Sequence, residues 1–98
     1  MQYAIYVDFN TFGSGAVSLT SGASRRDLEK YGITLEENLK LILYMTDWDA
    51  DGNEDDLIVS GVAHFEAATQ RWVAKINWDQ IKHTSELSDQ EKISFGIA

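Results

Sequence analysis

Acidic side chains at alternate positions form the clearest chemical pattern in this 98-residue sequence. Asp47, Asp49 and Asp51 are followed at once by Gly52 and Asn53. Calcium binds about six to eight oxygen ligands, and carboxylates crowded into one loop repel one another until a cation neutralises them. The pattern therefore predicts a divalent-cation site, with calcium as the ion.

This segment resembles the EF-hand family over the first six positions of that family's calcium loop. The resemblance implies ligands from Asp47, Asp49, Asp51, the carbonyl of Asn53, and Asp55. The remainder departs from the family pattern. Ile58 stands where the bidentate glutamate belongs, Glu54 occupies an apolar position, and the incoming segment alternates like a strand instead of a helix.

Most of the excess negative charge lies in the same segment. The net charge is −8, with 16 acidic against 8 basic residues. A charge of −6 falls on residues 47–56, here called the acidic loop, which contains no Lys or Arg. Its acidic residues are Asp47, Asp49, Asp51, Glu54, Asp55 and Asp56. Such a loop attracts a cation or a basic partner.

Trp48 is unusual because its indole lies among these carboxylates. An exposed indole can hold a cationic or peptide ligand by cation–π contact and stacking. We therefore expect Trp48, Glu54 and Asp56 to contact a partner. Two alternatives stay open: the loop is an acidic hairpin tip whose charge only keeps it soluble, or Trp48 folds back to cap one end of the fold.

Groups suited to catalysis are sparse, since the chain has no cysteine. Ser60 and His64 share a strand face, but four residues of extended strand separate them by about 13 Å unless a bulge at Gly61 intervenes. His64 with Asp79 or Glu66 is a further arrangement that nothing in the sequence selects. We predict a protein without enzymatic activity or cofactor, with an unrecognised active site as the alternative.

The composition also narrows the classes of partner. Clustered Lys and Arg are absent, which disfavours nucleic acid and anionic membranes. No apolar run approaches the roughly 20 residues that span a bilayer. We expect a cytoplasmic protein that binds another protein or a basic peptide, as a monomer or a homodimer.

Period-2 alternation predicts five strands, at residues 3–9, 17–19, 39–45, 57–65 and 72–76. The first two are expected to form a hairpin closed by a turn at residues 12–15. Gly61 predicts a bulge or a bend, and Asn38 a tight turn with positive φ.

Helical signals are short. A short helix is predicted between Ser24, as its N-cap, and Gly32, which ends it. A single helical turn is predicted at residues 78–83, with Asn77 before it as a cap. The tail from Thr84 has capping-box spacing at Ser88–Glu91, so it folds as a helix, docks as an edge strand, or frays. The predicted fold is mostly β and forms one domain, residues 1–98. It is a small five-stranded antiparallel SH3-like barrel or curved sheet. Residues 84–98 are docked on it or loosely attached. An α+β sheet is the alternative.

Overall fold

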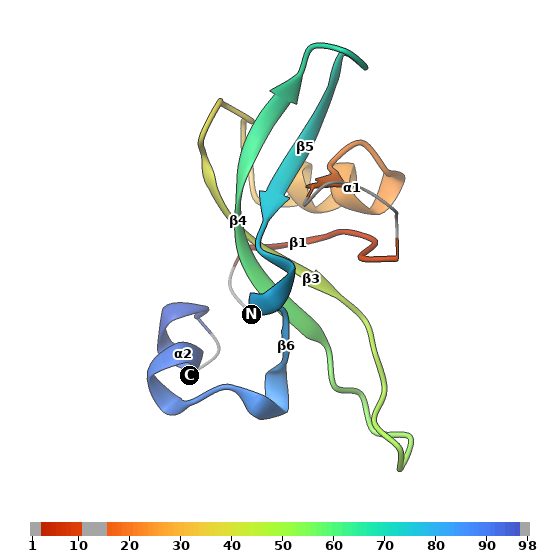
Figure 1. Cartoon of the computed structure of the whole chain (residues 1–98), viewed down its shortest axis with the longest axis vertical. Helices are drawn as coiled ribbons and strands as arrows, with labels where there is room; N and C mark the ends of the chain where they lie inside the picture. The colour runs from red at the N-terminus through yellow and green to blue at the C-terminus, as the bar shows by residue number, and fades with distance from the viewer. Residues whose placement is uncertain (1–2, 11–15, 97–98) are drawn as a thin grey trace.

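Alternating apolar residues build a mixed sheet of six strands with two short α-helices (Figure 1). The computed structural model describes residues 3–10 and 16–96. The strands are β1 (Ala4–Tyr6), β2 (Ala16–Ser18), β3 (Lys40–Met45), β4 (Leu57–Glu66), β5 (Arg71–Ile76) and β6 (Lys82–His83). The helices are α1 (Gly22–Lys30) and α2 (Asp89–Ser94), with 3₁₀ turns η1 (Trp78–Gln80) and η2 (Thr84–Glu86).

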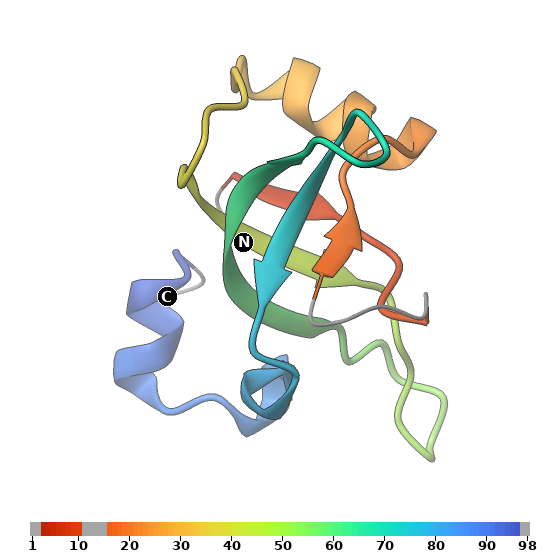
Figure 2. The ribbon, with the colours of Figure 1, turned by 45° about the horizontal axis from the view of Figure 1, so that its top comes forward.

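The strand order corrects the predicted topology. The order is β1-β3-β4-β5-β2, with β6 also paired to β4, and β1 runs parallel to β3. The first two strands therefore lie at opposite ends of the path, so the hairpin predicted between them is wrong. Its turn at residues 12–15 lies outside the described residues. The sheet is mixed, has six strands and does not close, so the five-stranded antiparallel barrel is also wrong. The predicted strand-rich, curved character of the fold is confirmed (Figure 2).

The core lies inside the curl of the sheet. Figure 2 shows β1 and β3 on one side of the curl and β5 and β2 on the other, with α1 across one end. One apolar cluster joins all of these elements, including Ile5, Val17, Leu28, Leu43 and Ala74. Alternation predicted its strand members Ile5, Val17, Leu43 and Ala74, because successive side chains of a strand point to opposite faces.

Gly61 shows how tightly this curl is packed. Residues 57–62 of β4 pair with β3 and residues 61–66 with β5, without a break in either register. Of the two alternatives predicted at Gly61, a bulge or a bend, the bulge is therefore absent. A Cβ at Gly61 would lie 2.8 Å from the Ile76 Cγ2 and 2.8 Å from the Lys75 carbonyl oxygen. Glycine is required here because β5 approaches too closely for any side chain.

Helix α1 protects the outer edge of β1. Ser21 caps the helix, three residues before the predicted cap, because the Ser24 side chain is buried and donates to the Tyr6 carbonyl. The Tyr6 N–H donates to Asp27 Oδ2 at 2.9 Å. Both backbone groups of an edge residue thus have partners. Gly32, at φ +63°, follows the helix as predicted.

The tail folds as one of the three predicted alternatives, a helix. Ser88 and Glu91 form the predicted capping box of α2, and Asn77 caps η1. Extending the β5 register along β4 would set Asp79 opposite Ile58, but Lys82 occupies that position, three residues later. The extra residues form η1.

No helix within residues 3–10 and 16–96 is long and apolar enough to cross a membrane.

Candidate functional site

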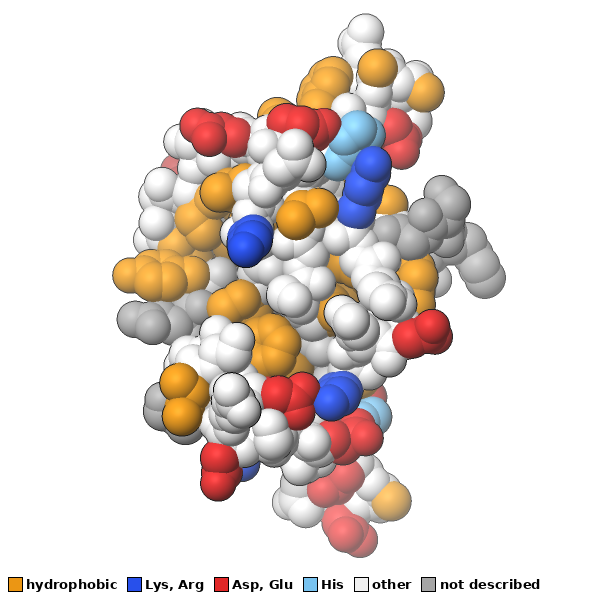
Figure 3. Space-filling model, turned by 60° about the vertical axis from the view of Figure 1, so that its left-hand side comes forward, with side chains coloured by type: hydrophobic (Ala, Val, Ile, Leu, Met, Phe, Trp, Pro, Cys, Tyr) orange, Lys and Arg blue, Asp and Glu red, His pale blue; other side chains and the backbone are white. Residues whose placement is uncertain are grey.

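The acidic loop is the turn of the β3–β4 hairpin, and it projects from one end of the molecule (Figure 1). Figure 3 shows acidic side chains gathered at that end. Asp49 shapes the turn, because its Oδ1 accepts the N–H groups of Asp51 and Asn53, each at 2.9 Å. Gly52 supplies the positive φ, +82°, that such a turn needs.

Strand pairing divides the loop's acidic side chains between two faces. The β3–β4 register reaches Met45 opposite Leu57 and resumes at the bridge between Trp48 and Glu54. In a paired ribbon, opposite residues and their second neighbours share a face. Thr46, Trp48, Glu54 and Asp56 therefore share one side, here called the Trp48 face, and Asp47 and Asp55 belong to the other.

Asp47 belongs to an ion-pair network with the C-terminal segment. The ring of His83 lies between two carboxylates, with Nε2 2.8 Å from Asp47 Oδ2 and Nδ1 3.0 Å from Glu86 Oε1. Both ring nitrogens face acceptors, so the geometry favours the imidazolium form. The hydrogen bond to Asp47, followed by that to Glu86, raises the pKa of His83. The hydrogen bond from His83 lowers the pKa of Asp47.

Asp55 holds the same segment at a second point. It accepts hydrogen bonds from the Ser85 hydroxyl at 2.7 Å, the Ser85 N–H at 3.0 Å and the Thr84 hydroxyl at 3.1 Å. The bonds from Ser85 lower the pKa of the Asp55 carboxyl. Together with the Asp47–His83 contact, these bonds fix the base of the loop to η2.

The carboxylates of three of the five predicted calcium ligands thus accept hydrogen bonds from the protein's own donors. Asp47 contacts His83, Asp49 accepts bonds within the turn, and Asp55 accepts bonds from residues 84 and 85. In the part of the chain that the structure describes, no three acidic, histidine or cysteine side chains are grouped so that they could hold a metal ion. Calcium would have to displace existing hydrogen bonds, and its binding by Asp47, Asp49, Asp51, Asn53 and Asp55 stays a prediction.

The Trp48 face is open. Trp48 is 59% exposed, so it does not fold back to cap the molecule. At the base of this face lies a cavity of about 300 Å³, here called the tyrosine pocket. It is lined by Ala4, Tyr31, Tyr44, Thr46, Glu54 and Asp56. Glu54 and Asp56, two of the three residues predicted to contact a partner, therefore line this pocket together with two tyrosine rings.

The ring of Tyr44 is held from two sides. It packs edge-on against Tyr6 with centroids 5.6 Å apart, and its hydroxyl donates to Asp27 Oδ2 at 3.4 Å. Burial, reinforced by the nearby Asp27 carboxylate, raises the pKa of Tyr44. Tyr31 packs edge-on against Tyr3 at 5.4 Å. Tyr31, the residue after α1, therefore supplies one wall of the tyrosine pocket, and Asp27 of α1 anchors Tyr44 in another.

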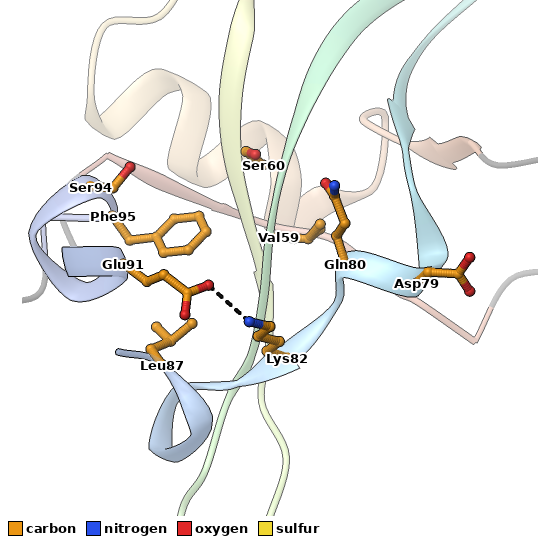
Figure 4. Close-up of a pocket in the computed structure, with 9 residues that line it drawn as sticks. All are labelled: Val59, Ser60, Asp79, Gln80, Lys82, Leu87, Glu91, Ser94 and Phe95. Atoms are coloured by element: carbon orange, nitrogen blue, oxygen red, sulfur yellow. Dashed lines mark hydrogen bonds and ion pairs between the residues drawn. The ribbon is translucent and has the colours of Figure 1, made fainter. Parts of the chain in front are cut away.

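A second cavity, of about 340 Å³, lies between β4, η1 and α2 (Figure 4). The Phe95 ring points into it, the Lys82 ammonium pairs with Glu91 at 3.0 Å, and the Asp79 carboxylate points away. Its basic group is thus already paired with an acid from α2. The lining mixes apolar side chains with polar ones, and among the described residues it shows no nucleophile hydrogen-bonded to a base.

The histidine considered for catalysis has another partner. His64 Nδ1 lies 2.5 Å from Glu37 Oε1, an interaction with the loop before β3. Ser60 and His64 stay on one regular strand, because no bulge at Gly61 draws them together. The structure therefore does not join Ser60, His64, Asp79 or Glu66 into a nucleophile–base pair.

Sequence reasoning missed Tyr31, Tyr44 and Thr46 as site residues. Tyr44 and Thr46 have the strand parity of Trp48, so extending the alternation into the loop would have found them. Tyr31 carries no such signal, because its place depends on where α1 packs. Comparison with known proteins adds no candidate: no protein-family model, curated protein or solved structure matches this chain.

Proposed function

We propose that this protein is a non-enzymatic binding module that docks a basic peptide segment of a partner protein on the Trp48 face. The observation that carries the proposal is Trp48 itself, 59% exposed and bridged to Glu54 beside the tyrosine pocket. A large exposed indole next to carboxylates favours contact with Lys and Arg side chains.

The charge distribution supports a basic partner. Six of the chain's acidic residues lie in the acidic loop, and their field attracts cations over roughly 10 Å at moderate salt. Asp47 and Asp55 are turned toward residues 83–86, where they hold the loop in place. Glu54 is exposed beside Trp48, and Asp56 lines the tyrosine pocket on the same face. SH3-like recognition modules, which bind partners through loops on a small β fold, supply an analogy for this role and no more.

The test is the affinity of a fluorescent basic peptide, measured by anisotropy at low and at high salt. We expect saturable binding that weakens as salt rises, because exposed charges are screened. Trp48→Ala should weaken binding by about tenfold or more, as loss of an aromatic anchor does. Glu54→Gln should weaken it less. Glu36→Gln, the same change at an exposed site before β3, is the matched control and should leave affinity unchanged.

Calcium is the alternative ligand for the same loop. A titration with Ca²⁺, with Mg²⁺ as control, separates the two functions, because peptide docking needs no metal. Saturable binding of calcium at stoichiometric amounts, together with no peptide binding, would replace this proposal with a cation site.

A further inference from the structure

The tyrosine pocket has the shape and charge to take one side chain of a partner. Its volume of about 300 Å³ is larger than the volume of the head group of one side chain. Its lining combines two phenol rings, a hydroxyl and two carboxylates. Within residues 3–10 and 16–96, no Lys, Arg or His contributes to that lining. A positively charged group with a flat apolar surface therefore fits it best.

Asp56 supplies a specific electrostatic reason for a cation. Its Oδ1 is shielded from solvent and has no hydrogen-bond partner among residues 3–10 and 16–96. A carboxylate partly removed from water without a cationic partner is costly, and a cation nearby recovers part of that cost. Asp56 lines the tyrosine pocket, so a cation bound there lies beside this carboxylate.

The two rings provide walls of fixed orientation. Tyr44 is held by Tyr6 and Asp27, and Tyr31 by Tyr3. Because these contacts exist before any ligand arrives, little side-chain entropy is lost on binding. The Lys30 ammonium, which does not line the pocket, lies 5.3 Å from the centroid of the Tyr31 ring, so this ring already attracts a cation.

We propose that the tyrosine pocket receives the guanidinium group of an arginine of the partner, an inference that rests on the proposed function. A guanidinium is planar, stacks on aromatic faces, and donates two parallel hydrogen bonds to a carboxylate. A lysine ammonium is a strongly hydrated point charge and gains less from the rings. Arginine thus uses the phenol rings and the exposed carboxylate of Glu54, and its charge lies beside the carboxylate of Asp56, whereas lysine uses mainly the charge.

The experiment compares two short peptides matched in length, spacing and net charge, one bearing arginines and the other lysines. Each is titrated into the ¹⁵N-labelled full chain and followed by amide NMR. We expect the arginine peptide to bind at least about fivefold more tightly, with the largest shifts at Tyr44, Thr46 and Asp56. Equal affinities would overturn the arginine preference and leave the proposed function standing. No binding of either peptide would overturn both.

Variants test whether the preference for arginine over lysine arises in the tyrosine pocket. Asp56→Asn and Tyr44→Leu should each reduce the ratio of the two affinities to near one. Asp51→Asn removes the same charge from the same loop outside the pocket, so it should weaken both peptides alike and preserve the ratio. If Tyr44→Leu does not fold, Glu54→Gln tests the same point at an exposed position. A ratio unchanged in Asp56→Asn and Glu54→Gln would contradict the assignment.

Discussion

Replacing Gly61 by alanine tests whether the close approach of β4 and β5 determines the curl that positions the acidic loop. The new Cβ would lie 2.8 Å from both the Ile76 Cγ2 and the Lys75 carbonyl oxygen, and 3.1 Å from the Leu43 Cδ1. The Lys75 oxygen is backbone within a paired strand, so it cannot move without shifting β5. Overpacking of this kind costs about 1–3 kcal/mol.

The assay is urea denaturation, compared with thermal unfolding. A loss of about 1–3 kcal/mol lowers the Tm of a domain of this size by roughly 4–8 °C per kcal/mol, with an unchanged dependence on urea. Gly22→Ala is the matched control, because a Cβ there meets nothing within 4 Å. The reasoning is refuted if Gly61→Ala unfolds within about 0.5 kcal/mol of the parent protein.

Two further predictions follow from buried and paired polar groups. Ser24→Ala should cost about 1–3 kcal/mol of unfolding free energy by urea denaturation, because it leaves the Tyr6 carbonyl at the sheet edge without its donor; a loss no greater than that of an exposed serine would contradict this. The raised pKa of His83 means that its contribution to stability is complete below the ordinary value near 6.5 and is lost as pH rises through the folded-state pKa. The lowered pKa values of Asp47 and Glu86 mean that their contribution is complete above their ordinary values, 3.8 and 4.5, and is lost as pH falls through the folded-state pKa values. The Tm should therefore be highest between about pH 4.5 and 6.5 with respect to this network, and Asp47→Asn should lower the titration midpoint of the His83 ring in NMR; an unchanged midpoint would show that the contact does not persist in solution.

Local signals in the sequence predicted local structure well. The alternation of Leu41 and Leu43 indicated the buried face of β3, and both are buried. Asn38 adopts the predicted positive φ, at 67°, and the spacing of Ser88 and Glu91 predicted the capping box of α2. Each of these depends on residues a few positions apart, where sequence and geometry are directly linked.

The pairing of strands far apart in the sequence could not be predicted from such local patterns. Two successive strands with a glycine-rich segment between them suggest a hairpin, but β1 pairs with β3 and β2 with β5. The buried Ser24 and Asp27 explain why: they satisfy the edge of β1 from a helix, so no second strand is needed there. The same limit applies to the site, where Tyr31 reaches the tyrosine pocket only through the packing of α1.

The acidic loop shows both outcomes in one segment. The sequence identified Trp48, Glu54 and Asp56 as partner-contact candidates, and strand register places all three on one face. It also grouped Asp47 with the metal ligands, whereas that carboxylate pairs with His83, 36 residues away. The acids of residues 47–56 look like one cluster in the sequence, but the paired ribbon sets Glu54 and Asp56 on one face and Asp47 and Asp55 on the other.

The central claim is that a basic peptide docks on the Trp48 face, and the most direct test is a map of amide and indole shifts in the ¹⁵N-labelled protein as an arginine-bearing peptide is added. The account predicts saturable shifts at the Trp48 indole N–H and at the amides of Glu54 and Asp56, with residues 83–86 unaffected. Shifts concentrated at residues 83–86, or no saturable shift at the Trp48 indole, would contradict it.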